Sequence, residues 1–191
     1  MEFELLGWPP EGPTLHLDHR EFAYAGKFVM SATGKAVAGE EGEKNGDGDD
    51  GDAILAATAF DEDRTDPNRL RIRYVTVRND RRGEGIGPRL LRFTAERGRE
   101  RGYTDVRIAA NNPFAYEACY RAGFAFTGEE TGLAELVLAY RPDREGRGRY
   151  QAGFDRYRGR DLSDAEESFL DDYRGRGPPA VVADPLSGNR V

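Results

Sequence analysis

Apolar positions recur along the chain with two different periods. Residues 53–60 (AILAATAF) form a short apolar run typical of a buried strand, and residues 70–78 (LRIRYVTVR) alternate and are rich in β-branched residues, which favours another strand. After a glycine-rich turn, residues 88–101 carry an apolar stripe at helical spacing. Pro88 suits the first position of that helix, and Gly102 is suited to end it.

The same alternation of periods continues toward the C-terminus. Residues 104–110 are predicted to form a strand, and residues 113–121 a short helix. A strand is expected to start at residues 123–127, and residues 134–140 (AELVLAY) predict a final strand. The resulting order of strand, glycine turn, helix, strand, helix, strand and strand predicts a mixed α/β sheet.

The N-terminal part predicts further strands and one polar loop. Residues 14–25 and 27–38 have the pattern of two strands, with turn signals at Gly26 and Gly34. Residues 39–52 contain only glycine, acidic residues, one lysine and one asparagine. Such a segment has almost no apolar area to bury, so a solvated, disordered loop is expected. A calcium loop is the weaker alternative, because the regular acid spacing and the closing glutamate are missing.

The composition changes beyond Pro142. Three aromatic residues at helical spacing, the first of them Tyr150, predict a helix. Ser163 followed by Glu166 has the form of a capping box that opens a second helix through Tyr173. The chain is therefore expected to consist of a domain at residues 1–141, a helical extension at residues 142–174 and a frayed tail at residues 175–191.

Composition and charge exclude some classes of protein. The chain has 35 acidic and 28 basic residues, and a net charge of −7 argues against a dedicated nucleic-acid binder. No apolar run approaches the roughly 20 residues that span a bilayer, and the N-terminus has no secretory pattern, so no membrane partner is expected. A single cysteine, Cys119, fits a reducing, cytoplasmic setting. The basic residues are nearly all arginine, which adaptation to high salt and a codon bias explain equally well.

One stretch between a predicted strand and a predicted helix carries chemistry. Residues 82–88 (RGEGIGP) can bring backbone N–H groups onto a phosphate, and the helix that follows adds the positive end of its dipole. Gly85 and Gly87 allow close approach, while Arg81 and Arg82 add charge. A Walker loop would need a Lys after its second glycine, and a dinucleotide fingerprint would need Gly at Pro88, so both are disfavoured. A glycine turn that merely joins strand to helix is the structural alternative.

A second motif at the right distance favours the functional interpretation. The segment from Val77 to Leu91 resembles the acetyl-CoA motif of the GNAT superfamily of N-acetyltransferases, with Asn79 in place of the usual proline. The segment from Asn112 to Phe124 (NPFAYEACYRAGF) is similar to the second motif of that superfamily. The resemblance covers about residues 53–140 and is specific because both motifs lie in the expected elements.

The resemblance implies that the chain binds acetyl-CoA as an acetyl donor, with no metal. It implies a mainly antiparallel sheet with flanking helices, whose strands at 70–78 and 104–110 splay apart around the pantetheine arm. Backbone groups of the first strand would bond pantetheine and polarise the thioester carbonyl, the loop would hold the pyrophosphate, and Asn112 would contact the pantetheine arm. The cofactor-binding residues implied in this way are Val75, Thr76, Val77, Arg82, Gly83, Glu84, Gly85, Ile86, Gly87, Pro88 and Asn112.

The chain departs from the family at the catalytic residues. The family's general acid is a tyrosine four residues before the glycine at position 123, where this chain has Cys119, with Tyr120 next to it. Cys119 is expected to line the thiol site, and Tyr120 is the better proton donor if the last turn of the helix tightens. Water remains an alternative proton source.

The acceptor side also differs from the family. The usual glutamate base on the fourth strand is absent, and the family's helix pair does not fit between His19 and Lys27. His16, Asp18 and His19 are candidate bases, with ordinary surface residues on an edge strand as the alternative. Tyr74 and Thr76 are expected to share a strand face with Ile72, where they could order a water relay or simply cap a core.

These observations predict a GNAT-like α/β domain that acetylates a small or peptidyl amine through a ternary complex. The rival hypothesis is a non-catalytic acyl-CoA-binding or regulatory module, which the missing tyrosine and glutamate favour. The apolar face of the helical extension makes a homodimer a candidate assembly. The acceptor itself does not follow from the sequence.

Overall fold

The computed structural model describes residues 1–40, 54–141, 144 and 146–185. The chain divides into two compact units. Unit 1 comprises residues 1–106 with the C-terminal residues from 183, and unit 2 comprises residues 107–182. The acidic loop expected at residues 39–52 lies, apart from its first two residues, outside the described part of the chain.

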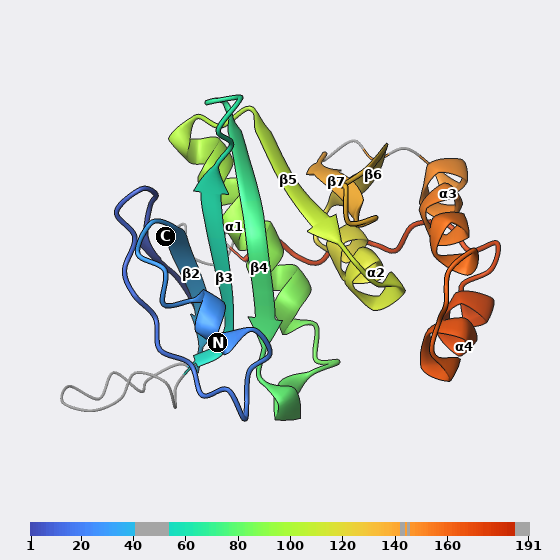
Figure 1. The fold of residues 1–191 in the computed structure, drawn as a ribbon, viewed down its shortest axis with the longest axis horizontal. Coiled ribbons are helices and arrows are strands. Elements are labelled where there is room, and N and C mark those ends of the chain that lie inside the picture. The colour runs from blue at the N-terminus through green and yellow to red at the C-terminus, as the bar shows by residue number, and fades with distance from the viewer. Residues whose placement is uncertain (41–53, 142–143, 145, 186–191) are drawn as a thin grey trace. The chain divides into compact units, whose positions relative to one another are not determined.

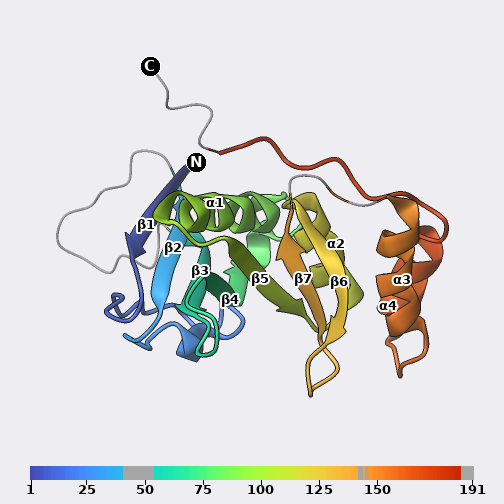
Figure 2. The same ribbon diagram turned by 90° about the horizontal axis from the view of Figure 1, so that it is seen from above.

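Unit 1 is an antiparallel sheet covered on both faces (Figure 1). Figure 2 shows α1 on one face and the segment between β1 and β2, residues 8–33, on the other. The elements of this unit, whose strands pair in chain order, are β1 (Glu2–Gly7), η1 (Ala25–Lys27), β2 (Gly34–Gly39), β3 (Ile54–Glu62), β4 (Arg69–Val77), η2 (Asn79–Arg81) and α1 (Ile86–Arg101). The strands expected at 53–60 and 70–78 and the helix expected at 88–101 are thereby confirmed, although Pro88 is the third residue of α1 and not the first.

The two strands expected in the N-terminal part are wrong. Residues 14–25 contain no strand, and of residues 27–38 only the last five belong to β2. The backbone of this segment makes turn bonds, such as that from Phe22 N–H to the Asp18 carbonyl at 2.9 Å. It also makes isolated longer-range bonds, such as that from Leu15 N–H to the Phe28 carbonyl at 3.1 Å, but no ladder. Leu15, Phe22 and Phe28 are buried against β2 and β3 as separate anchors, so the segment buries apolar side chains without forming a strand.

A buried lysine holds the end of this segment to β2. Lys35 is fully buried, and its ammonium donates to the Met30 carbonyl at 2.7 Å and to the carbonyl and hydroxyl of Thr33 at 2.8 Å each. Burial lowers the pKa of Lys35. Three neutral acceptors match the three protons of the ammonium, which lets a lysine occupy the interior.

A β-bulge at Arg73 divides β4 into two halves. Ala59 of β3 lies opposite Tyr74 and Phe60 lies opposite Ile72, so Arg73 has no partner in the register. A one-residue insertion reverses the faces to which the following side chains point. Tyr74 accordingly packs against the core formed with residues 8–33, away from α1.

The bulge corrects the expected face of β4. A Cβ added at Gly98 of α1 would lie 2.8 Å from Leu70, and one added at Gly87 would lie 3.2 Å from Val77. Both strand residues therefore face α1, although they are seven positions apart. Ile72 shares the face of Leu70, whereas Thr76 lies on the opposite face. The prediction that Ile72 and Thr76 share one face of the strand is therefore wrong.

Unit 2 pairs three strands with three helices. Its strands are antiparallel in the order β5, β7, β6, and the first two residues of β5 belong to unit 1. α3 packs on α2 and β6, and α4 packs on α2 and α3. The elements are β5 (Asp105–Ala110), α2 (Pro113–Arg121), β6 (Phe124–Glu130), β7 (Leu136–Tyr140), α3 (Arg147–Arg158) and α4 (Asp164–Asp172). The capping box of Ser163 and Glu166 is confirmed at the start of α4.

Buried aromatic rings join α2, α3 and β6. The ring of Tyr116 on α2 lies 5.0 Å from that of Phe154 and 5.9 Å from that of Tyr157, both on α3. The Tyr116 hydroxyl donates to the Tyr150 carbonyl at 3.1 Å, and a Cβ at Gly153 would overlap that hydroxyl. We call this set the aromatic cluster; its members are Tyr116, Tyr120, Phe126, Tyr150, Phe154 and Tyr157.

Part of the chain after α4 is bonded to unit 2. The carbonyl of Arg176 accepts from the Gln151 side chain at 2.7 Å, and Val182 N–H donates to the Arg121 carbonyl at 2.8 Å. Arg144 donates to the carbonyls of Tyr120 and Pro179, which ties this segment to the end of α2.

The described residues thus form a mixed α/β protein with seven mainly antiparallel strands, flanking helices and a helical C-terminal part, as expected. The splay between the strands at 70–78 and 104–110 stays a prediction. Among the described residues, no helix combines the length and the apolar character needed to cross a bilayer.

Gly153→Ala should destabilise unit 2, because the added methyl group collides with the Tyr116 hydroxyl at the contact between α2 and α3. Overpacking of this kind costs about 1–3 kcal/mol in free energy of unfolding. Gly148→Ala on the exposed first turn of α3 is the matched control, and it should be neutral or stabilising by up to about 1 kcal/mol. Urea unfolding of both variants measures the difference, and equal stabilities would contradict this packing.

Candidate functional site

The glycine loop between β4 and α1 ends in an uncapped helix N-terminus. Gly85 is the N-cap of α1, with a left-handed backbone (φ 76°) and no side chain that caps the helix. Arg89 N–H makes the first hydrogen bond along α1, to the Gly85 carbonyl at 3.4 Å. The N–H groups of Ile86 and Gly87 precede that bond and so have no partner within the helix, which is the arrangement that binds anions. Gly87 also lets α1 approach Val77 closely.

The two arginines of the loop differ in their partners. Arg81 Nε is 3.0 Å from Glu84 Oε1, and Arg81 Nη1 is 2.7 Å from Glu40 Oε1. These hydrogen bonds, first to Glu84 and then to Glu40, raise the pKa of Arg81, so its charge is matched by two carboxylates. Arg82 is exposed and forms no ion pair with any described residue. Of the two, Arg82 is therefore the one whose charge is available to an anion.

The expected site residues of the loop differ in exposure. Arg82, Gly83 and Glu84 are exposed, whereas the four residues from Gly85 to Pro88 are buried. The loop therefore offers exposed backbone and one exposed cation just ahead of the buried first turn of the helix.

The expected site residues on β4 lie after the bulge and pair with β3. Val75 lies opposite Thr58, whose hydroxyl is 2.9 Å from that of Thr94 on α1, so Val75 and Val77 occupy the face of α1. Thr76 is only 4% exposed, and its hydroxyl has no hydrogen-bond partner among the described residues.

Asn79 anchors the segment between β1 and β2 to the end of β4. Its backbone N–H donates to the Glu21 carbonyl at 2.9 Å, and its side-chain amide donates to the Arg20 carbonyl at 3.0 Å. A proline, which the family motif has here, lacks both donors. The sequence analysis did not predict this anchoring role of Asn79. The missing proline and the missing helix pair, taken together, were the signal that could have indicated it.

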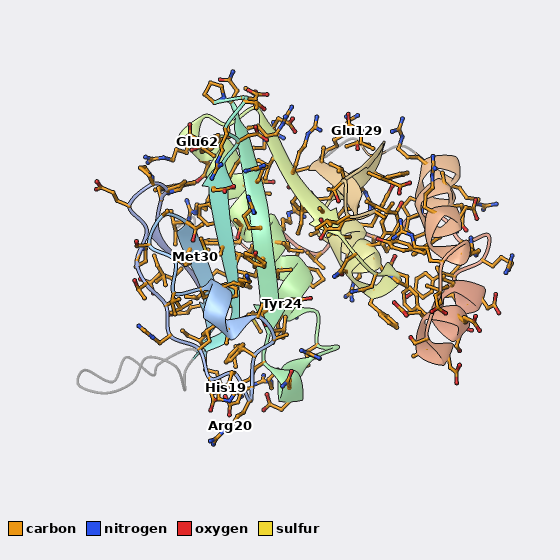
Figure 3. All side chains as sticks on the ribbon, in the orientation of Figure 1. His19, Arg20, Tyr24, Met30, Glu62 and Glu129 are labelled. Carbon is orange, nitrogen blue, oxygen red and sulfur yellow. The ribbon has the colours of Figure 1, made fainter. Side chains whose placement is uncertain are left out.

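The anchored segment places Tyr24 beside β4 (Figure 3). Tyr24 has a left-handed backbone (φ 60°), its side chain is 56% exposed, and its ring lies 6.1 Å from that of Tyr74. Lys27 Nζ lies 6.0 Å from the centre of the Tyr74 ring. The side of β4 opposite α1 therefore presents two phenols and one ammonium.

The candidate bases of this segment are surface residues. The side chain of His19 is 84% exposed, and its Nδ1 lies 3.6 Å from a carboxylate oxygen of Asp18 (Figure 3 labels His19). His16 is exposed as well. None of the three lies on a strand, so the edge strand expected for them is wrong.

In unit 2, the side chain of Asn112 caps α2. Its Oδ1 accepts from Ala115 N–H at 2.8 Å, and its Nδ2 donates to Asn111 Oδ1 at 2.8 Å. Helix initiation explains the Asn-Pro pair of the second motif without a ligand, because proline at the first helical position and asparagine at the N-cap both favour a helix start.

Cys119 and Tyr120 are buried at the other end of α2. Cys119 is 2% exposed, and burial raises the pKa of its thiol to about 12. The Tyr120 hydroxyl accepts from Phe126 N–H at 3.0 Å and keeps its own proton, while burial raises its pKa. The helix end does tighten, because Gly123 N–H donates to the Tyr120 carbonyl three residues back at 3.1 Å.

The expected site residues thus form two sets. The strand and loop residues lie on consecutive elements of unit 1, and Asn112, Cys119 and Tyr120 lie at the two ends of α2 in unit 2. No group of three or more histidine, cysteine or acidic residues that could hold a metal ion occurs among the described residues.

Solved acetyltransferases resemble the chain at low identity. A nourseothricin acetyltransferase is 25% identical over 56% of this chain and 62% of its own, with a TM-score of 0.41. An IAA acetyltransferase from Bacillus cereus is 19% identical over 72% of this chain and 96% of its own, with a TM-score of 0.47. An acetyltransferase from Bacillus subtilis, solved in complex with CoA, is 14% identical over 56% of this chain and 75% of its own, with a TM-score of 0.43.

The matched part is less than two thirds of the nourseothricin acetyltransferase, and these TM-scores lie below 0.5, so the family assignment does not depend on them. No curated protein matches the chain. The model of the acetyltransferase (GNAT) family matches residues 4–124, which is more than half of the chain and includes β4, the glycine loop and α2. The chain belongs to the GNAT family of acetyltransferases.

Proposed function

We propose that the protein is an N-acetyltransferase that transfers the acetyl group of acetyl-CoA to an amine. The observation that carries this proposal is the N-terminus of α1, which has Gly85 as its N-cap, no side-chain cap and a position directly beside the end of β4. An anion-binding helix end next to a strand suits a long ligand with a pyrophosphate at one end and a thioester at the other.

The proposed cofactor site extends from the loop to the strand. The N–H groups from Gly85 to Gly87 would bind the pyrophosphate, with Arg82 as the unpaired cation. Glu84 is held by Arg81, which keeps its carboxylate from repelling the phosphates. Backbone groups of the strand residues 75–77 would bond the pantetheine arm and the thioester carbonyl. The contact of Asn112 with the pantetheine arm stays a prediction, and its side chain already accepts a hydrogen bond from Ala115 N–H.

The chemistry requires a neutral amine and a proton for the leaving thiolate. The amine nitrogen attacks the thioester carbon, the carbon–sulfur bond breaks with its electron pair on sulfur, and the amine loses one proton. Tyr120 is the proposed proton donor, because its hydroxyl accepts a hydrogen bond and still carries its own proton. The thiol of the neighbouring Cys119 also stays protonated at neutral pH.

The alternative function is acyl-CoA binding without catalysis. The burial of both Cys119 and Tyr120 favours it. The glycine loop fits both functions equally well, so only turnover separates them.

Arg82→Ala should weaken binding of acetyl-CoA roughly tenfold, because one charge-assisted contact to a phosphate is lost. Binding of S-acetylpantetheine, which lacks the pyrophosphate, should not change. Arg99→Ala removes an equally exposed charge at the far end of α1 and serves as the control. Calorimetry of the three proteins decides, and equal losses for both ligands would contradict a phosphate contact.

The parent protein should release thiol from acetyl-CoA in the presence of at least one member of a panel of small and peptidyl amines. Tyr120→Phe should lower turnover at least roughly tenfold at unchanged cofactor affinity, as loss of a general acid does. Tyr116→Phe, one helical turn earlier in the same aromatic cluster, is the control, and Cys119→Ala tests the thiol. If neither Tyr120→Phe nor Cys119→Ala lowers turnover, neither side chain is the general acid. If the parent acetylates no amine, the result favours the alternative function, acyl-CoA binding without catalysis.

A further inference from the structure

Thr76 is a buried hydroxyl without a partner. It lies on β4 after the bulge, opposite Ala57 of β3, on the face directed away from α1. The side chain is 4% exposed, and Oγ1 makes no hydrogen bond with any described residue. A buried polar group is ordinarily paired, because leaving it unpaired forfeits its hydrogen bonds with water.

The neighbouring strand contains a threonine in the opposite situation. Thr58 of β3 is also fully buried, but its hydroxyl is 2.9 Å from that of Thr94 and 3.4 Å from the Ala36 carbonyl. The hydroxyl of Thr58, on the face of α1, therefore has hydrogen-bond partners, whereas the hydroxyl of Thr76, on the other face, has none among the described residues. Valine would fill the same volume at position 76 and would be at least as favourable in a strand, so packing alone does not explain the hydroxyl.

We propose that the Thr76 hydroxyl donates a hydrogen bond to the thioester carbonyl oxygen of bound acetyl-CoA. This inference rests on the proposed function, which places the thioester at residues 75–77. It adds a side-chain donor to the backbone groups of β4. Because CoA lacks the thioester carbonyl, Thr76 distinguishes the acetylated cofactor from the free thiol.

The contact strengthens during acetyl transfer. When the amine nitrogen bonds to the carbonyl carbon, the electron pair of the C=O bond moves onto oxygen. It returns as the carbon–sulfur bond breaks and sulfur keeps the bonding pair. Thr76 keeps its proton throughout and stabilises the charge on oxygen, which is the role of an oxyanion donor.

The experiment compares Thr76→Val, Thr76→Ser and the control Thr58→Val. Affinities for acetyl-CoA and for CoA are measured by calorimetry, stability by urea unfolding, and turnover with the best amine. Thr76→Val should be at least as stable as the parent and should lose roughly fivefold in preference for acetyl-CoA over CoA. Turnover should fall roughly 10- to 100-fold, and Thr76→Ser should restore most of both quantities. Thr58→Val should be less stable than the parent and keep the preference, because its hydroxyl is bonded within the protein.

Three results overturn the proposal: a Thr76→Val protein with the parent's preference and turnover, a parent that binds acetyl-CoA and CoA equally, or a parent that binds neither. If Thr76→Val does not fold, Thr76→Ala removes the same hydroxyl with less bulk and is measured in the same way. If Thr76→Val loses the parent's preference for acetyl-CoA over CoA, but the parent acetylates no amine, the contact is supported and acetyl transfer is refuted. The two failures are therefore distinguishable.

Discussion

The rest of unit 1 depends on one extra residue in β4. Gly87 and Gly98 lie three turns apart on α1 and so present the same face to the sheet, where they meet Val77 and Leu70. Those two strand residues are seven positions apart, an odd number that would put them on opposite faces of a regular strand. The bulge at Arg73 removes this conflict. It lets one helix lie close to both ends of one strand, and thereby fixes the helix N-terminus beside the strand end.

The bulge has a second effect on the other face. It turns Tyr74 and Thr76 toward the segment between β1 and β2, so β4 offers phenol and hydroxyl groups where its first half offers ion-paired arginines such as Arg71. The two glycines therefore position the phosphate end of the proposed site, and the bulge positions its thioester end. Bulges next to active sites commonly re-aim side chains in this way.

Local signals in the sequence predicted part of this arrangement. The bounds of α2 follow from the asparagine cap, the proline after it and the apolar stripe, and α1 follows from its stripe and Gly102. The bulge leaves no such mark, because Arg73 continues the alternation of LRIRYVTV and only the partner strand shows it to be unpaired. The N-terminal strands were wrong for the reverse reason: the alternation at Leu15 and Leu17 is real, but the segment has no strand partner. Burial at Cys119 and Tyr120 depends on helices from later in the chain, which spacing alone does not place.

The departure at Asn79 links the proposed acceptor side to the proposed thioester contact. Residues 8–33 have no strand or α-helix of their own, so their position depends on buried side chains and on hydrogen bonds to neighbouring elements. Lys35 holds the end near β2, and Asn79 holds Arg20 and Glu21 against the end of β4. Asn79 comes three residues after Thr76. A single short stretch of chain therefore carries the proposed thioester contact and the anchor of the segment that presents Tyr24, and a shift of β4 would move both together. Under the proposed function, the two hydrogen bonds of Asn79 would take over part of the positioning that the expected helix pair gives to the acceptor side.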